Sequence, residues 1–306
     1  MNAASDTTDG ISAPAKKTRP FYWSVRRELW ENRSLYIAPL IVAVVVVVGF
    51  IFSAIGLPER RRAVLLLDDP AKQRAAIEMP YDMAAMMIMF TAFIVGVFYC
   101  LDALHGERRD RSILFWKSLP VSDLTTVLSK AFVPLVVMPV ISFVVIIATQ
   151  LIILLITSAT LVMHGMSPAT TLAHTNLFQN TLILLYGLVA LSLWHAPTYG
   201  WMLLVSGWVR RAAFLWAILP GLAIGIFERI TFGTSHFANL MKERFMSWAA
   251  EAFVLRHGPK GTPILDSLSQ LSPGRYLTTP GLWLGLVFAT VCFVAAVRFR
   301  RYRGPI

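Results

Sequence analysis

Residues 106–130, GERRDRSILFWKSLPVSDLTTVLSK, form a charged bridge between two long apolar runs of the chain. The bridge is too polar to lie in lipid, yet it contains a compact apolar cluster. The cluster consists of Ile113, Leu114, Phe115, Trp116 and Leu119. Ile113 and Trp116 stand one helical turn apart, and the LPVS sequence at 119–122 interrupts the helix before another begins. This pattern predicts a short helix on the membrane surface that presents side chains to a groove on a partner.

The rest of the chain is dominated by apolar residues. Of its 306 residues, 56% are hydrophobic and 15% are charged, with a mean hydropathy of +0.62, whereas soluble domains carry about 25% charged residues. Residues 37–57, 83–101, 133–163 and 177–209 contain no Lys, Arg, Asp or Glu. Each run is close to or above the roughly 20 residues that a helix needs to cross a bilayer. The sequence therefore predicts an all-α integral membrane protein.

Six transmembrane helices are expected within one transmembrane domain, residues 36–306. The predicted spans are residues 36–57, 81–104, 131–157, 177–209, 212–227 and 281–297. Pro134 and Pro139 are expected to bend the third span, and Pro197 the fourth.

The segments outside the spans have different compositions. Residues 1–20 are polar and are predicted to be a disordered cytosolic tail. Residues 21–35 alternate aromatic and charged residues, which predicts an interfacial amphipathic helix with its arginines on lipid phosphates. Residues 58–80 are expected to be a polar loop, 105–130 a coupling loop, and 228–280 an outer helical region. Within that outer region, an amphipathic helix is expected over residues 236–255.

The basic residues give an orientation. Six spans place both termini on one side of the membrane, together with the bridge. That side would carry 17 of the 28 Lys and Arg residues and the other side 11, so the termini and the bridge are predicted to be cytosolic. The basic residues gather at the ends of apolar runs and form no continuous stripe, so the net charge of +11 does not indicate a nucleic-acid partner.

No catalytic or metal-binding signature occurs in the sequence. There is no nucleophile elbow, no H-E-x-x-H motif and no Walker A sequence. Cys100 and Cys292 lie in or beside apolar runs and are predicted to be small buried side chains. We therefore expect no catalytic residue, no metal and no cofactor in this chain.

Two ionisable residues near the spans are candidate sites. Asp102 ends the second span, where it is expected to cap the helix or pair with the cluster at 108–111; a proton relay is the alternative. His195 lies deep in the fourth span and is expected to pair with a backbone carbonyl. The alternative for His195 is a place on a translocation path.

The bridge and its position resemble the membrane-spanning permease subunit of bacterial type 2 ABC exporters, the ABC-2-type permeases. In that family an interfacial helix precedes six spans. The loop between spans two and three carries a Glu, a basic and polar run, a coupling helix, a Leu-Pro-Val/Ile-Ser turn and a Lys. Here these elements resemble Glu107, residues 108–112, 113–118, 119–122 and Lys130. The family's usual Gly-Thr is replaced by Arg111-Ser112. The likeness covers nearly the whole chain in architecture and residues 106–130 in motif.

The resemblance implies a half-transporter. Two permease subunits, identical or different, would form the translocation path of an exporter in a bacterial inner membrane. Each would bind a separate ABC ATPase subunit, two copies per transporter, which carries ATP and Mg. The implied coupling residues are Glu107, Arg108, Asp110, Arg111, Ser112, Ile113, Trp116, Leu119 and Pro120. Trp116 and Leu119 are expected to anchor in the ATPase, with Glu107, Asp110 and Arg111 making charge pairs at the rim.

Two other classes of function stay open. An ion-driven secondary transporter or channel needs a polar path, which Gln150, His195 and Ser206 do not form in sequence. A membrane-embedded enzyme needs acids or histidines at one depth, whereas His164, His174 and His195 are predicted at different depths.

Overall fold

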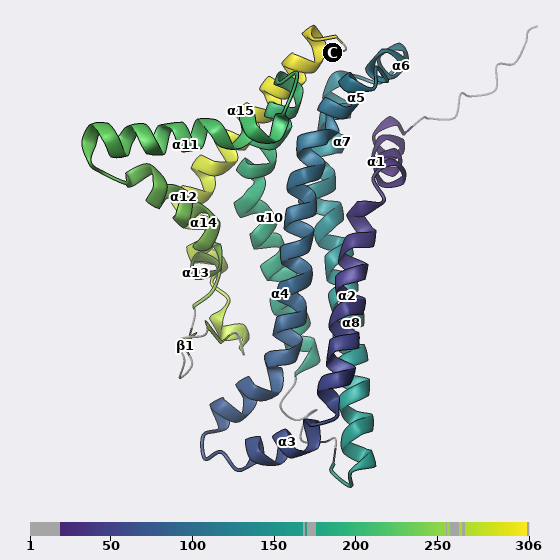
Figure 1. The fold of residues 1–306 in the computed structure, drawn as a ribbon, viewed down its shortest axis with the longest axis vertical. Coiled ribbons are helices and arrows are strands. Elements are labelled where there is room, and N and C mark those ends of the chain that lie inside the picture. The colour runs from purple at the N-terminus through teal and green to yellow at the C-terminus, as the bar shows by residue number, and fades with distance from the viewer. Residues whose placement is uncertain are drawn as a thin grey trace, which may run out of the picture.

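The computed structural model describes residues 19–167, 169, 176–254, 256–257, 263–264, 267–304 and 306. The predicted tail at 1–20 lies outside the described residues except for its last two. The described chain is all-α apart from one antiparallel pair of two-residue strands, and six of its helices are long and apolar enough to cross a membrane. This confirms the predicted fold class, and the chain is a multi-pass membrane protein (Figure 1).

The elements follow one another in a simple order. They are α1 (Pro20–Glu31), α2 (Ser34–Ala54), α3 (Leu57–Leu65), α4 (Pro70–Ala103), α5 (His105–Arg109), α6 (Ile113–Ser118), α7 (Asp123–Phe132), η1 (Val133–Val137), α8 (Met138–Met163), α10 (Leu177–Trp208), α11 (Ala213–Phe232), α12 (His236–Met246), α13 (Trp248–Ala252), β1 (Arg256–His257), β2 (Pro263–Ile264), η2 (Leu268–Gln270), α14 (Pro273–Thr278) and α15 (Pro280–Tyr302).

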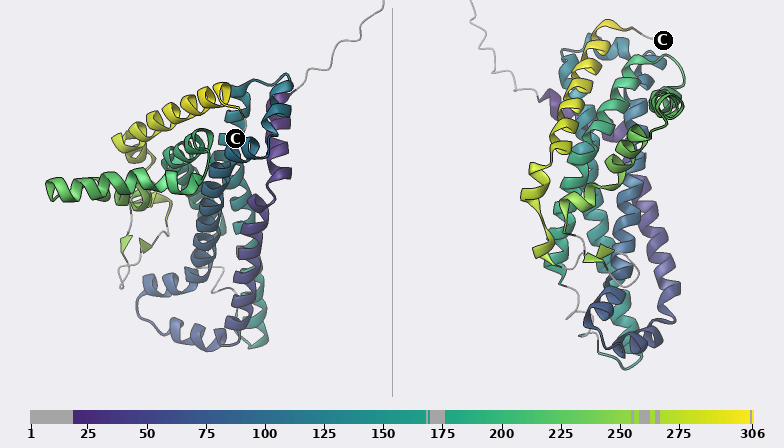
Figure 2. Two further views of the ribbon diagram at one scale, coloured as in Figure 1. Left: turned by 45° about the horizontal axis from the view of Figure 1, so that its top comes forward. Right: turned by 90° about the vertical axis from the view of Figure 1, so that its left-hand side faces the viewer.

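Long helices α2, α4, α8 and α10 run side by side, and α15 packs along α10 (Figures 1 and 2). Their outward faces are apolar; in α2, for example, Val44 is 62% exposed and Phe52 is 70% exposed. Apolar exposure on this scale is stable when lipid rather than water surrounds the bundle. The start of α1, the bridge helices α5 and α6, and the C-terminus lie at the same end, which we call the bridge end.

The second span begins earlier than the sequence predicts. Residues 58–80 were expected to be a loop, but they form α3 and the first part of α4. Asp69 caps α4 by accepting a hydrogen bond from the Ala71 amide at 2.9 Å, and Pro70 occupies the first helical position. Both features favour a helix start, so the charged residues that follow extend the span beyond its apolar part.

The two prolines of the third span alter the helical hydrogen bonding only near their own positions. Pro134 lies in η1, a π-helical segment that joins α7 to α8, and Pro139 lies in the first turn of α8. Because proline lacks an N–H and its ring crowds the preceding turn, the hydrogen-bond ladder widens here without ending the helix. The third span therefore continues from α7 to Met163.

Helix α11 has the composition of a span but lies in a different direction. It crosses the axis of the long helices and extends away from them (Figures 1 and 2). The chain turns at Ala212, whose φ of 54° is in the left-handed region. The Trp201 indole holds the start of α11 to α10 by donating to the Ala217 carbonyl at 2.9 Å.

The segment after α11 returns to the bundle. The predicted helix at 236–255 is divided at Ser247 and ends at Ala252. Arg244 donates to the Gly281 carbonyl at 2.9 Å, and its guanidinium lies 4.5 Å from the centre of the Trp194 ring. Helices α12 to α14 consequently lie beside α10 and α15 along the bundle (Figure 1). Cys100 and Cys292 are buried and unbonded to each other, as predicted.

Candidate functional site

The bridge folds as three short segments joined by sharp turns. Helix α5 ends at Arg109, with Asp110 as its C-cap, and Arg111 turns the chain with a φ of 58°, a value that is uncommon outside glycine. Helix α6 follows, as the sequence predicts. Ser122 then caps α7 by accepting a hydrogen bond from the Thr125 amide at 3.1 Å. The predicted helix break at 119–122 is confirmed.

Beneath the bridge lies a buried cluster of charges centred on Lys130 of α7. The Lys130 ammonium is 2.8 Å from Oε1 of Glu28 on α1 and 3.1 Å from Oε1 of Glu107 on α5. The Lys130 side chain is 2% exposed and that of Glu28 is 1% exposed. A lysine so deeply buried is stable only when carboxylates neutralise it, as they do here.

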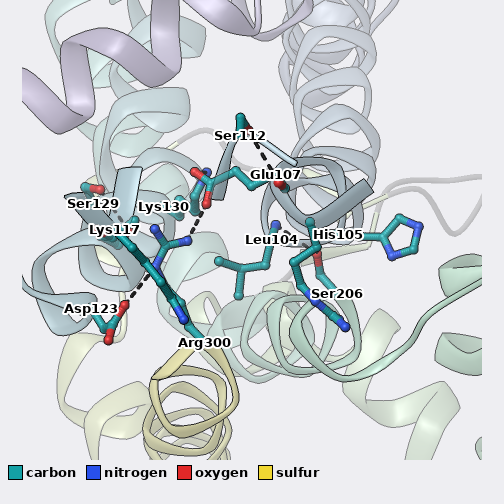
Figure 3. Close-up of polar contacts among 12 residues, drawn as sticks. Leu104, His105, Glu107, Ser112, Lys117, Asp123, Ser129, Lys130, Ser206 and Arg300 are labelled. Atoms are coloured by element: carbon teal, nitrogen blue, oxygen red, sulfur yellow. Dashed lines mark hydrogen bonds and ion pairs between the residues drawn. The ribbon is translucent and has the colours of Figure 1, made fainter. Parts of the chain in front are cut away.

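Arg300 of α15 extends the cluster on one side. Its guanidinium pairs with the second carboxylate oxygen of Glu107 and lies 3.2 Å from Oδ1 of Asp123 on α7 (Figure 3). Figure 3 shows Glu107 between Lys130 and Arg300, so one carboxylate holds cations from two different spans.

Arg27 of α1 extends the cluster on the other side. Its guanidinium is 2.6 Å from Glu28, 2.9 Å from Glu107 and 3.5 Å from Glu31. Burial disfavours the charged guanidinium, but these carboxylates outweigh burial and hold the pKa of Arg27 above its ordinary value. The arginines of α1 were expected on lipid phosphates; Arg27 instead faces the protein.

The buried ion cluster, defined as Arg27, Glu28, Glu107, Asp123, Lys130 and Arg300, balances three cations with three carboxylates. The Tyr99 hydroxyl of α4 donates to Oε2 of Glu28 at 2.9 Å and satisfies a further acceptor. The cluster therefore joins α1, α4, α5, α7 and α15. A buried network of ion pairs makes the joined segments rigid, so a displacement of α5 would move the ends of three spans.

Helix α6 has an inner and an outer face. Ile113 is 1% exposed, and the Trp116 ring lies 3.9 Å from the guanidinium carbon of Arg27. On the outer face, Leu114 is 59% exposed and Phe115 is 60% exposed. Trp116 was expected to anchor in a partner, but it packs under Arg27 within this chain.

The remaining predicted coupling residues differ in exposure. Leu119 is 38% exposed beside the outer face, and Pro120 and Arg111 are exposed as well. Asp110 is exposed and pairs with Arg109 at 3.1 Å. Ser112 is partly buried, with its hydroxyl donating to the Glu107 carbonyl at 3.4 Å.

The position of Glu107 differs from the one expected from the sequence. It was expected to make a charge pair at the edge of a docking surface, but its side chain is 8% exposed and lies at the centre of the buried ion cluster. The cations contributed by α7 and α15 draw this carboxylate inward, because an ion pair shielded from water is stronger than an exposed one.

Arg108 and Ser206 fix the bridge to the end of α10. The buried Arg108 guanidinium donates to the carbonyls of Gly207 at 2.9 Å and Val209 at 3.1 Å. The Ser206 hydroxyl accepts from the amides of Leu104 at 2.9 Å and His105 at 2.8 Å (Figure 3). Ser206 was considered for a translocation path, but it satisfies the backbone where α4 meets α5.

Asp102 and His195 each have a polar contact within this chain. Asp102 is exposed and lies 3.8 Å from Arg109, within the basic cluster of the bridge. His195 is buried, with Nδ1 2.9 Å from the Leu191 carbonyl and its ring 4.8 Å from that of Phe93. Neither residue is part of the buried ion cluster.

Sequence reasoning missed most of that cluster. Glu28, Asp123 and Arg300 were given no site role, and Arg27 was expected on lipid phosphates, although each contacts another member. Tyr99, which donates to Glu28, was not singled out either. One signal was available: Lys130 and Arg300 stand beside the third and last apolar runs, where a cation requires a counter-ion. Within the described ranges, no group of three or more His, Cys, Asp or Glu side chains is placed to hold a metal ion.

Comparison with known proteins adds no assignment to these observations. No family model, no curated protein and no solved structure matches the chain.

Proposed function

We propose that this chain is the permease subunit of an ATP-driven exporter and that the bridge couples it to a separate ATPase subunit. In this proposal two permease subunits, identical or different, form the translocation path in a bacterial inner membrane. Each binds one ABC ATPase, which supplies ATP and Mg. The bridge and both termini face the cytosol, in keeping with the distribution of basic residues.

One observation carries the proposal: the bridge has an exposed apolar face on a rigidly held base. We call Leu114, Phe115 and Leu119 the outer apolar face; they are 59%, 60% and 38% exposed. Their base is held by Ile113 in the core and by Glu107 in the buried ion cluster. An apolar group that is exposed outside lipid suits a groove on a partner. The rigid base would transmit a displacement of α6 to the membrane spans.

The conformation of the turn before α6 also supports the proposal. Arg111 stands where ABC-2-type permeases usually have glycine, and its φ of 58° is one that glycine adopts without steric cost. The sequence departs from the family pattern here, but the backbone has the conformation for which glycine is favoured.

Co-purification with an ATPase tests the proposal. The partner to be tested is a Walker A protein whose gene neighbours that of this chain, produced together with this chain and purified in lipid. The test variant is Leu114→Ala with Phe115→Ala, because both side chains are exposed and their loss leaves the buried ion cluster intact. The matched control is Leu66→Ala with Leu67→Ala, which are 82% and 39% exposed and follow α3.

We expect the control pair to form the complex normally and to retain substrate-stimulated ATP hydrolysis. The test pair should weaken complex formation by about 2 kcal/mol or more, as truncation of central apolar anchors does in other interfaces. Equal complex formation and coupled ATPase activity in both pairs would contradict the proposed coupling surface. Transport by the purified chain alone under an ion gradient would favour a secondary transporter instead.

A further inference from the structure

A second polar feature of the bridge end is a cavity of about 1100 Å³ at the corner between α10 and α11. Four arginines line it: Arg108, Arg210, Arg211 and Arg303. They come from α5, from the turn after α10 and from the end of α15. We call this cavity the arginine pocket.

None of the four arginines forms an ion pair with an Asp or Glu side chain of the described residues. Arg108 donates only to carbonyls, and Arg303 donates to the Trp208 carbonyl. Arg210 and Arg211 are exposed and make no hydrogen bond or ion pair with any described residue. Among the described lining residues there is no Asp or Glu side chain. Like charges held together without counter-ions attract an anion.

The other walls fit an anion with an apolar neighbour. Trp208 and Trp216 line the pocket, with ring centres 5.5 Å apart in an edge-to-face arrangement. Indole rings of this exposure are typical of the level of lipid headgroups.

We infer that the arginine pocket binds a phosphate-bearing anion. The phosphate would be contacted by Arg210 and Arg211, while the already bonded Arg108 and Arg303 form the walls. The chemistry is shared by the headgroup of an anionic phospholipid and by free phosphate. The tryptophan pair makes the lipid the better fit, since acyl chains could pass along the apolar surface of α11.

Binding to the purified full chain in neutral detergent tests this inference. Three probes are compared: phosphatidylglycerol, the zwitterionic phosphatidylcholine, and inorganic phosphate. The test variant is Arg210→Ala with Arg211→Ala, both of which are exposed. The control is Arg33→Ala with Arg298→Ala, which removes two exposed arginines outside the pocket and so leaves the same net charge.

We expect phosphatidylglycerol to bind the unmodified chain and the control more tightly than phosphatidylcholine. The Arg210/Arg211 variant should lose about 25-fold in affinity, since a basic residue near an anionic surface contributes on the order of fivefold. If inorganic phosphate binds with the same arginine dependence and the lipid does not, the ligand is a soluble phosphate. Equal binding to the test and control variants, or no preference for either phosphate anion over phosphatidylcholine, overturns the inference.

Discussion

The buried ion cluster and the arginine pocket lie at the same end of the molecule and use neighbouring residues. Glu107 and Arg108 are adjacent on α5, and Arg300 and Arg303 are one turn apart near the end of α15. In the cluster every cation has a carboxylate within ion-pair distance. In the pocket none of the four arginines forms an ion pair with a described residue. The number of arginines therefore does not indicate the role of a basic site; the supply of carboxylates does.

This difference in charge balance implies that the buried ion cluster holds helices together, whereas the arginine pocket binds a ligand. A charge-balanced cluster of ion pairs has little to gain from a charged ligand and instead holds helices together. An open group of like charges destabilises its own surroundings until a counter-ion arrives. The variants that follow change the two regions separately, and they are ordered from the largest expected effect to the smallest.

Lys130→Met should have the largest effect on stability. The change leaves Glu28 and Glu107 facing each other without the central cation, and breaking a buried pair on one side costs about 3–5 kcal/mol. Equilibrium unfolding of the purified protein in mixed detergent micelles measures the loss. Lys117→Met is the matched control, because Lys117 is exposed and its ammonium donates, among the described residues, only to the carbonyls of Arg301 and Arg303.

Adding Glu107→Gln to Lys130→Met should recover part of that loss, because it restores the balance between the two remaining cations, Arg27 and Arg300, and the carboxylates of the cluster. If Lys130→Met and Lys117→Met unfold at the same detergent concentration, the cluster is not the rigid link that we describe.

Arg108→Ala should rank second, with a loss of about 1–3 kcal/mol in the free energy of unfolding, the usual penalty for leaving buried polar groups unsatisfied. Its guanidinium is the donor for the carbonyls of Gly207 and Val209. Arg109→Ala on the same helix is the control, because Arg109 is 59% exposed. Equal stability of the two variants would mean that Arg108 lines the arginine pocket without stabilising the fold.

The sequence predicted the spans better than it predicted the site, for a physical reason. A run such as 133–163 has to lie in lipid whatever surrounds it, so local composition determines it. The cluster instead depends on contacts between distant residues: Glu28 meets Lys130, and Glu107 meets Arg300, only after five helices have packed. The direction of α11 was also hidden, because it depends on the backbone conformation of Ala212 rather than on the apolar helix itself.

The orientation of α6 likewise depends on contacts with distant residues. The sequence favoured the face of Ile113 and Trp116 as the one presented to a partner, but Ile113, Leu114, Phe115 and Trp116 are all apolar, so composition does not separate the inner from the outer face. The buried ion cluster decides, because Arg27 attracts the Trp116 ring and thereby turns Leu114 and Phe115 outward.

Trp116→Leu should therefore affect stability, by about 1 kcal/mol, which is the order of a cation–π contact. Phe115→Leu, one residue earlier and 60% exposed, is the control and should unfold like the unmodified chain. In an ATPase complex the order should reverse, with Phe115→Leu weakening association more than Trp116→Leu does. A larger association defect in Trp116→Leu would restore Trp116 as the anchor.

Arg210→Ala with Arg211→Ala should have the smallest effect on the free energy of unfolding. This variant is the sharpest test of the comparison between the buried ion cluster and the arginine pocket. Neither side chain has a partner among the described residues, so in ligand-free detergent the free energy of unfolding should change by no more than about 0.5 kcal/mol. With phosphatidylglycerol present, the unmodified chain should gain stability by mass action and the variant should gain less. A large loss without lipid would show that the pocket arginines hold the fold, as the buried ion cluster does, and the two regions would then differ in charge but not in role.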